Sequence, residues 1–155
     1  MNGITYIERF IDSPERLYKY LETEIEWDER MQARKTASFG EAYYYSQISY
    51  PYQDFPQIFK IILDKLESTI EFRPNNCLIN FYLNGKSKMG FHSDQTDILE
   101  SGTGVAIISV GETRTLRFRN ISDQELTKDF ELPSGSLIYM TQEVQSDWQH
   151  AIPKS

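Results

Sequence analysis

The residues best suited to chemistry form the triplet His92-Ser93-Asp94. Its outer side chains, an imidazole and a carboxylate, lie on one face if the triplet belongs to a strand, because side-chain direction repeats every second residue. The sequence holds only one other histidine, His150. Two histidines and a carboxylate can occupy one face of an octahedral iron(II) and leave three positions open for a bidentate oxo acid and dioxygen. The sequence therefore predicts a metal centre of His92, Asp94 and His150.

The H-x-D triplet is weak evidence by itself, since a surface histidine near a solvated aspartate has the same pattern. Its context favours the metal site. His92 follows Gly90-Phe91 and a run of strand-like apolar residues, and His150 lies in another strand-like segment. Because both histidines are placed in this way, the joint interpretation is stronger than either alone.

The composition is that of one globular domain. The 155 residues are 39% hydrophobic and 14% aromatic, which is enough to bury a core. The single cysteine, Cys77, excludes an internal disulfide and lies in an apolar run, so we expect a core residue in a reducing compartment. Without a membrane-length apolar stretch or a signal-peptide pattern, the expected protein is cytoplasmic, monomeric and free of membrane partners.

The charge balance limits the kinds of partner. Sixteen Lys and Arg residues against 23 Asp and Glu residues give a net charge of -7, which argues against strong nonspecific binding to phosphate backbones. Short basic clusters occur in three stretches, and each fits a solvated face as well as a local basic rim. They are Arg30, Arg34 and Lys35; Lys86 and Lys88; and Arg114, Arg117 and Arg119.

Two helices are predicted in the N-terminal half. The first follows a strand at Ile4 to Phe10 and begins at Ser13-Pro14, an N-cap residue followed by proline. The second follows a loop that ends at Phe55-Pro56, and Arg73-Pro74 stops it. Each helix has one apolar stripe. The stripes are Leu17, Leu21 and Ile25 in the first helix, and Phe55, Phe59, Ile62 and Leu66 in the second.

Between the helices, Met31 to Gly40 is polar and basic and leads into Tyr43-Tyr44-Tyr45. Aromatic side chains beside cations can stack on flat bases or sugars. They can equally be half-buried tyrosines of a strand, and both interpretations stay open.

From Cys77 onward the pattern changes to short strands separated by turn residues. The predicted strands are Cys77 to Tyr82, Met89 to Asp94, Val105 to Val110, Thr113 to Arg119, Glu125 to Leu132, Ser136 to Met140 and Trp148 to Ile152. The predicted turns are Asn84-Gly85, Gly111-Glu112, Asn120 to Asp123, Pro133 to Gly135 and Thr141 to Asp147. Two helices followed by many strands indicate an α+β fold with a jelly roll or barrel. In such a fold we expect the strands of His92 and His150 to meet because two sheets close over one another.

Several motifs stand in the order of a known enzyme family. They are Cys77-Leu-Ile-Asn80-Phe-Tyr82, Asn84-Gly85, Gly90-Phe-His92-Ser-Asp94, Ile108-Ser-Val-Gly111 with Arg114 and Phe118, Gly135-Ser-Leu-Ile and Trp148-Gln-His150. The chain thereby resembles the AlkB-type iron(II) and 2-oxoglutarate-dependent dioxygenases, most strongly from Asn76 to Pro153 and also from Arg34 to Ser46. The resemblance implies one domain over residues 1–155 with a double-stranded β-helix (jelly roll) and N-terminal helices packed on one sheet. Helices and a substrate lid would occupy about 1–75, and the jelly-roll core about 76–155.

The resemblance also implies roles for particular residues. His92, Asp94 and His150 would bind iron(II), while Asn80 and Tyr82 would bind 2-oxoglutarate. The segment Arg34 to Gly40 resembles a lid over a flipped-out nucleobase in alkylated single- or double-stranded nucleic acid. The implied substrate-binding residues are Arg34, Lys35, Phe39, Tyr43 and Thr96. In the implied reaction, dioxygen and 2-oxoglutarate give succinate and carbon dioxide, an N-alkyl carbon is hydroxylated, and formaldehyde leaves.

One departure concerns the end of the chain. In the family, a strand after the second histidine carries an arginine that pairs with the distal carboxylate of 2-oxoglutarate, with another arginine nearby. This chain ends at Ser155, five residues after His150. We expect a fragment or truncated form, because loss of the strand would leave an exposed sheet edge. The alternatives are weaker cosubstrate binding or replacement by Arg114, Arg117 or Arg119.

A second departure lies two residues after Asp94. Repair members of the family carry an acidic residue there, facing the alkylated base, whereas this chain has Thr96 followed by Asp97. With the acidic net charge, Thr96 favours an alternative in which the same oxygenase acts on a small molecule or a protein side chain. A third function, a catalytically silent jelly-roll binding module, follows if 2-oxoglutarate cannot bind.

The oxygenase hypothesis makes a direct prediction for the triplet. His92→Ala or Asp94→Ala removes a metal ligand, so either change should abolish succinate formation from 2-oxoglutarate. Succinate is measured after incubation with iron(II) and dioxygen. Full turnover by either variant would contradict the hypothesis.

Overall fold

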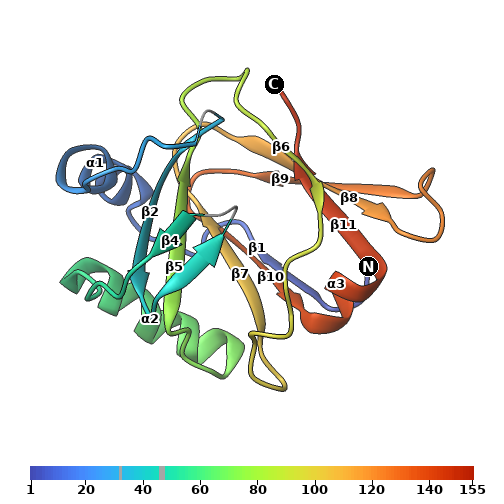
Figure 1. The fold of residues 1–155 in the computed structure, drawn as a ribbon, viewed down its shortest axis with the longest axis horizontal. Helices are drawn as coiled ribbons and strands as arrows, with labels where there is room; N and C mark the ends of the chain where they lie inside the picture. Colours follow the sequence, from blue (N-terminus) through green and yellow to red (C-terminus); the bar gives the residue numbers. More distant parts are fainter. Residues whose placement is uncertain (32, 46–47) are drawn as a thin grey trace. The chain divides into compact units, whose positions relative to one another are not determined.

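Two antiparallel sheets form the part of the chain that contains both histidines (Figure 1). In this computed structural model, residues 1–31, 33–45 and 48–155 are described, and they divide into two compact units. We call Met1–Lys19 with Lys88–Ser155 the sandwich unit, and Tyr20–Ser87 the middle unit. The single domain expected over the whole chain stays a prediction.

The sandwich unit holds seven strands in its two sheets. The first sheet has the order β1-β10-β7 and the second the order β6-β11-β8-β9. The strands are β1 Ile4–Ile7, β6 Met89–His92, β7 Gly104–Ser109, β8 Arg114–Asn120, β9 Thr127–Leu132, β10 Ser136–Thr141 and β11 Trp148–Ile152. The short helix α3, Gln142–Asp147, connects β10 to β11 and so links the two sheets.

The core of the sandwich unit lies between these sheets. Leu116 and Phe118 alternate with arginines along β8 and are fully buried, as are Leu137 and Ile138 of β10. Contacts between Tyr6 of β1 and the second sheet join the two layers. Its ring centroid lies 5.4 Å from that of Phe130, and its hydroxyl donates to the carbonyl of Glu131. The alternation along β8 therefore gives the second sheet one fully buried face, whereas the consecutive buried residues of β10 show that both faces of this strand are covered.

The middle unit contains two strand pairs and a longer helix. Its elements are β2 Lys35–Gly40, β3 Tyr43–Tyr45, β4 Ile48–Tyr50, α2 Gln57–Ile70 and β5 Asn76–Phe81, and α1, Pro14–Glu24, begins in the sandwich unit and ends here. β2 pairs with β5, and β3 with β4. Burial raises the pKa of the Cys77 thiol in β5 to about 12, so the thiol stays protonated at neutral pH. The expected structural role of Cys77 is consistent with this inert state.

The mixed α+β class is confirmed, and most predicted strands lie within two residues of the observed ones. Three predicted bounds are wrong. The first strand ends at Ile7 rather than Phe10, and Thr141 to Asp147 contains the helix α3 rather than only a turn. The first helix ends at Glu24, so Ile25 of its predicted apolar stripe lies outside it. In α2, Phe59, Leu63 and Leu66 are buried and Ile62 is half-buried. The packing of both helices on one sheet stays a prediction.

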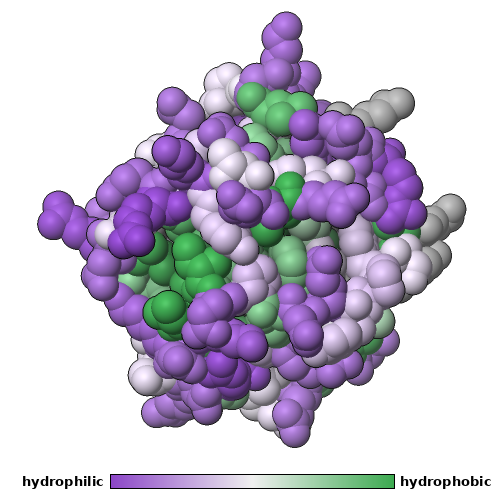
Figure 2. All heavy atoms as spheres, turned by 90° about the vertical axis from the view of Figure 1, so that its left-hand side faces the viewer, coloured by the Kyte–Doolittle hydropathy of each residue, from purple (hydrophilic) through white to green (hydrophobic). Residues whose placement is uncertain are grey.

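The outer face of α2 is largely polar. Its exposed residues are mostly polar. In Figure 2, most of the surface in view is hydrophilic, with hydrophobic side chains gathered in a smaller area. Ile61 of α2 is an exception to the polar pattern because it is 62% exposed. None of the helices in the described part of the chain has the length and hydropathy needed to span a membrane.

The close packing of β7 against β10 can be tested at Gly104. A Cβ atom there would lie 2.1 Å from the carbonyl oxygen of Met140 and 2.8 Å from the hydroxyl of Tyr139. Gly104→Ala should therefore lower the free energy of unfolding by about 1–3 kcal/mol, measured by urea denaturation. Gly90→Ala is a matched control in β6, where a Cβ meets nothing within 4 Å. An equal loss in both variants would contradict the packing argument.

Candidate metal centre

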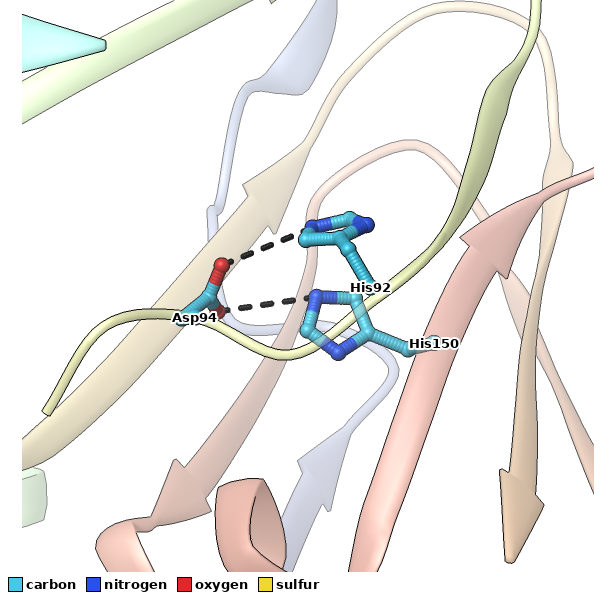
Figure 3. A group of neighbouring side chains, drawn as sticks. All are labelled: His92, Asp94 and His150. Carbon is cyan, nitrogen blue, oxygen red and sulfur yellow. Dashed lines mark ion pairs between the residues drawn. The ribbon is translucent and has the colours of Figure 1, made fainter. Parts of the chain in front are cut away.

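His92 and His150 face each other across neighbouring strands of one sheet (Figure 3). The antiparallel register of β6 and β11 places His150 directly opposite His92, and the ring centroids are 4.3 Å apart. Residues opposite each other in this way have Cβ atoms about 5 Å apart. The two histidines therefore meet as cross-strand neighbours. The expectation that they meet through closure of two sheets is wrong.

Asp94 completes the group from just beyond the end of β6. Its two carboxylate oxygens each lie 3.5 Å from an imidazole Nε2, Oδ1 from that of His92 and Oδ2 from that of His150. The strand ends at His92, so the prediction that both outer residues of the triplet lie on one strand is wrong. Beyond the end of β6, the Ser93 hydroxyl donates to the carbonyl of Trp148 in β11, and the backbone N–H of Asp94 donates to Gln145 of α3. The carboxylate still points at both rings (Figure 3).

The backbone of β6 fixes the orientation of the His92 ring. Its Nδ1 lies 2.8 Å from the carbonyl oxygen of Gly90. A carbonyl can only accept a hydrogen bond, so Nδ1 of a neutral His92 carries the proton, and Nε2 keeps a lone pair on the side of Asp94. This is the tautomer that a metal ion bound through Nε2 requires.

Burial sets the protonation of the His150 ring, which is only 2% exposed. Its pKa is lowered to about 4, mainly by burial; the nearby Asp94 opposes this shift and His92 adds to it. For Asp94 itself, burial raises the pKa, but the contacts with the two histidines outweigh burial and the net shift is downward. At neutral pH the site therefore presents a neutral His150 and an ionised carboxylate.

These three residues fit a divalent metal ion. Their ligand atoms lie within 4.8 Å of one another, and they form the one such group of histidine, cysteine and acidic residues in the described ranges. Metal ligands must be deprotonated, which His150 and Asp94 already are at neutral pH. Two imidazoles and one carboxylate are the donor set of iron(II) oxygenases that keep open coordination positions.

Most of the other predicted site residues belong to the middle unit. Arg34 is buried, and its Nε donates a 2.7 Å hydrogen bond to Oδ1 of Asn80. The structure thus brings together a predicted substrate residue and a predicted cosubstrate residue. Lys35 is half-buried and forms a 3.0 Å ion pair with Glu29. Tyr82 is half-buried just after β5.

Phe39 lies in the core of the middle unit. It is 6% exposed, and its ring meets Phe59 of α2 edge to face at 5.1 Å. Tyr43 begins β3, but its side chain lies outside what the structure describes, as do residues 46 and 47. Thr96 is half-buried in the sandwich unit, in the loop after Asp94. The lid predicted from Arg34 to Gly40 is largely the strand β2.

The arginines of β8 differ in the face that they occupy. His150 pairs with Phe118 in the ladder, so Arg117 and Arg119 extend from the opposite face of the sheet. Arg117 forms a bidentate ion pair with Asp129. The guanidinium of Arg119 lies 3.9 Å above the Phe91 ring. Neither arginine shares a strand face with His150, so the register does not support Arg117 or Arg119 as a replacement cation.

Arg114 shares the inward face of β8 with Leu116 and Phe118. It donates a 2.9 Å hydrogen bond to the carbonyl oxygen of Pro153, which follows β11. Of the three candidate cations in β8, it alone has a side chain on the same face as His150.

Two residues hold the triplet in place in ways that the sequence did not predict, Ser93 within the triplet and Gln145 outside it. Ser93 donates through Oγ to the carbonyl oxygen of Trp148 at 2.8 Å. Gln145 of α3 is buried and bonds to both the backbone and the carboxylate of Asp94. The six residues of α3 are too few to show a helical period, so no pattern singled out Gln145.

Comparison with known proteins identifies related sequences. Residues 9–155 match the family model described as the 2OG-Fe(II) oxygenase superfamily. Alpha-ketoglutarate-dependent dioxygenase alkB homolog 3 of Mus musculus is 30% identical over 166 residues, which cover 94% of this chain and 58% of the mouse protein. The Homo sapiens protein of the same name is 32% identical over 133 residues, 79% of this chain and 46% of the human protein. The chain thus spans about half the length of these curated relatives.

More distant relatives extend the comparison. DNA oxidative demethylase ALKBH2 of Arabidopsis thaliana is 27% identical, with 99% of this chain and 62% of the plant protein covered. Among solved structures, the one titled "The structure of OsALKBH1" has a TM-score of 0.71 at 15% identity, covering 99% of this chain and 86% of that chain. This structural match supports the predicted double-stranded β-helix.

The buried imidazole of His150 makes the stability of the metal-free protein depend on pH. The folded chain protonates His150 only near pH 4, whereas the unfolded chain does so near pH 6.5. Between these values the unfolded state binds more protons, so stability falls as the pH is lowered through this window. The loss should reach up to about 3 kcal/mol, measured by urea unfolding at several pH values. In His150→Gln the loss should be smaller, and a flat profile for the parent protein would contradict the argument.

Proposed function

Because this chain belongs to the 2OG-Fe(II) oxygenase superfamily, as an AlkB-type member, we propose that it removes alkyl groups oxidatively from nucleobases in DNA or RNA. One observation carries the proposal, the convergence of the donor atoms of His92, Asp94 and His150. The relatives support the substrate class, since one of them is named a DNA oxidative demethylase.

The chain is an iron(II) and 2-oxoglutarate-dependent dioxygenase, and its own residues would perform distinct tasks. His92, Asp94 and His150 would hold iron(II), which when bound supplies oxidation by dioxygen coupled to decarboxylation of 2-oxoglutarate. Asn80 and Tyr82 would bind the cosubstrate. Arg34 supports this role of Asn80, because its hydrogen bond occupies Oδ1 and leaves the Asn80 amide nitrogen to donate to an oxygen of the ligand.

The proposed reaction balances without a further reagent. One N-methyl base, one dioxygen and one 2-oxoglutarate give the N–H base, formaldehyde, succinate and carbon dioxide. One oxygen atom enters succinate, and the other leaves in formaldehyde after the hydroxylated carbon separates from nitrogen. The protein must bring an alkylated base to the metal centre, and Arg34, Lys35, Phe39, Tyr43 and Thr96 are the proposed substrate-binding residues. Since Phe39 is buried in the middle unit, its part would be to support β2, the strand that carries Lys35 and directly follows Arg34.

A second candidate function keeps the same chemistry on a small molecule or a protein side chain. Thr96 favours it, because this half-buried position offers no carboxylate to an alkylated, positively charged base. The net charge of -7 points the same way. The two candidates differ in whether the protein binds single-stranded oligonucleotides in a salt-sensitive manner.

The proposal is tested by cosubstrate binding followed by turnover. Anaerobic titration of the iron(II)-loaded protein with 2-oxoglutarate should produce the saturable visible band of an iron-bound oxo acid, and His150→Ala should lose it. With an N-methylated single-stranded oligonucleotide and air, formaldehyde and succinate should form in equal amounts, whereas the unmethylated oligonucleotide should give no formaldehyde.

The failures are distinguishable. A visible band with neither oligonucleotide binding at low salt nor formaldehyde release would favour the second candidate. Iron demonstrably bound without any band would contradict the assigned cosubstrate site.

A further inference from the structure

Gln145 contacts Asp94 at two points through a single amide group. Its Oε1 accepts a 2.7 Å hydrogen bond from the backbone N–H of Asp94, and its Nε2 lies 3.3 Å from the carboxylate oxygen Oδ2. From these contacts we propose that Gln145 is a positioning residue, which holds the Asp94 carboxylate in place for a metal ion. This inference rests on the proposed iron(II) site.

The hydrogen-bond partners fix the orientation of the Gln145 amide group. A backbone N–H can only donate, so the group that meets Asp94 N must be the oxygen of Gln145. The amide nitrogen then faces the carboxylate, to which it can only donate. Because the amide is planar, both bonds form together only when the Asp94 side chain keeps one orientation relative to its own backbone. Gln145 therefore selects a rotamer of Asp94 rather than merely lying beside it.

The burial of Gln145 raises the cost of any other arrangement. Gln145 is 5% exposed, and its Nε2 also approaches Sδ of Met140, a weak acceptor, at 3.7 Å. A buried amide that lacks hydrogen-bond partners destabilises the folded state, so the two bonds between Gln145 and Asp94 stabilise this arrangement. Asp94 itself lies outside the strand ladder, because β6 ends at His92.

The position of Gln145 in the chain links the Asp94 carboxylate to the strand that carries His150. α3 leads directly into β11, which carries His150. Ser93 adds a second link through its 2.8 Å hydrogen bond to the carbonyl oxygen of Trp148, the first residue of β11. The segment that delivers one histidine thus also orients the carboxylate that must bind the same metal.

Loss of the amide should weaken metal binding without removing a ligand. Partners that orient metal ligands typically contribute about 10–100-fold to affinity. Gln145→Met keeps the length of the side chain but neither hydrogen bond, and should raise the Kd for cobalt(II) at least about tenfold. Gln145→Asn keeps the amide but is one methylene too short to meet both groups, and should also weaken binding. Gln142→Met is the matched control in α3, because Gln142 is partly exposed and bonds to Glu100 instead.

The experiment measures cobalt(II) binding to the full chain by calorimetry, together with the visible absorption of the bound cobalt. Thermal unfolding of each metal-free variant shows that it is folded at the assay temperature, so a purely structural loss is separated from a loss of ligand orientation. If Gln145→Met does not fold, Gln145→Asn decides. The expected result is weaker binding and an altered cobalt spectrum in the Gln145 variants alone.

Other outcomes overturn the inference. A Kd within twofold of the parent, or an equal loss in Gln142→Met, would show that Gln145 does not position Asp94. A parent protein that binds no cobalt(II) would overturn the proposed metal site as well. Normal cobalt binding by the parent and by the Gln145 variants would leave the metal site intact and remove only the role of Gln145.

Discussion

The register between β6 and β11 is the constraint on which the rest of the site depends. Side chains alternate between the faces of a strand, so a slip of one residue would turn one imidazole to the opposite face. The observed register places His92 opposite His150 and then shifts before Ile152 pairs with Met89. On its other side, β11 pairs in regular register with β8, whose Phe118 is fully buried opposite His150. Packing of the core thus sets the position of His150, and β6 must match it.

The chemistry of the site follows from what surrounds each donor. His150 is buried and remains neutral near pH 7, whereas the Asp94 carboxylate is kept ionised by its contacts with the histidines. The hydrogen bond from Nδ1 to the backbone carbonyl of Gly90 fixes the tautomer of neutral His92. A different contact thus controls each of the three donors, and at neutral pH His150 and Asp94 can bind a divalent metal without first losing a proton.

Local sequence patterns predict the strands and the candidate metal ligands but not their exact placement. Alternation along β8 is strong because Leu116 and Phe118 lie between arginines, and the scarcity of histidine identifies the triad. The partner of His92 across the ladder is a property of strand pairing, which no local pattern contains. The role of Gln145 depends on a contact with a residue far away in sequence, as does the hydrogen bond between Arg34 and Asn80. Such pairs form only after the chain has folded, so residue type alone does not reveal them.

The place of β6 in its sheet has a thermodynamic consequence. β6 is one of the two edge strands of its sheet, and among the described residues its neighbour in the sheet order is β11. Edge strands held by few ladder bonds open at a lower free energy than central strands. A metal ion bound by both His92 and His150 would hold β6 against β11, so the free-energy cost of closing β6 would offset part of the free energy of metal binding. The apparent metal affinity would then report how often β6 is closed as well as how well the three ligands fit the ion.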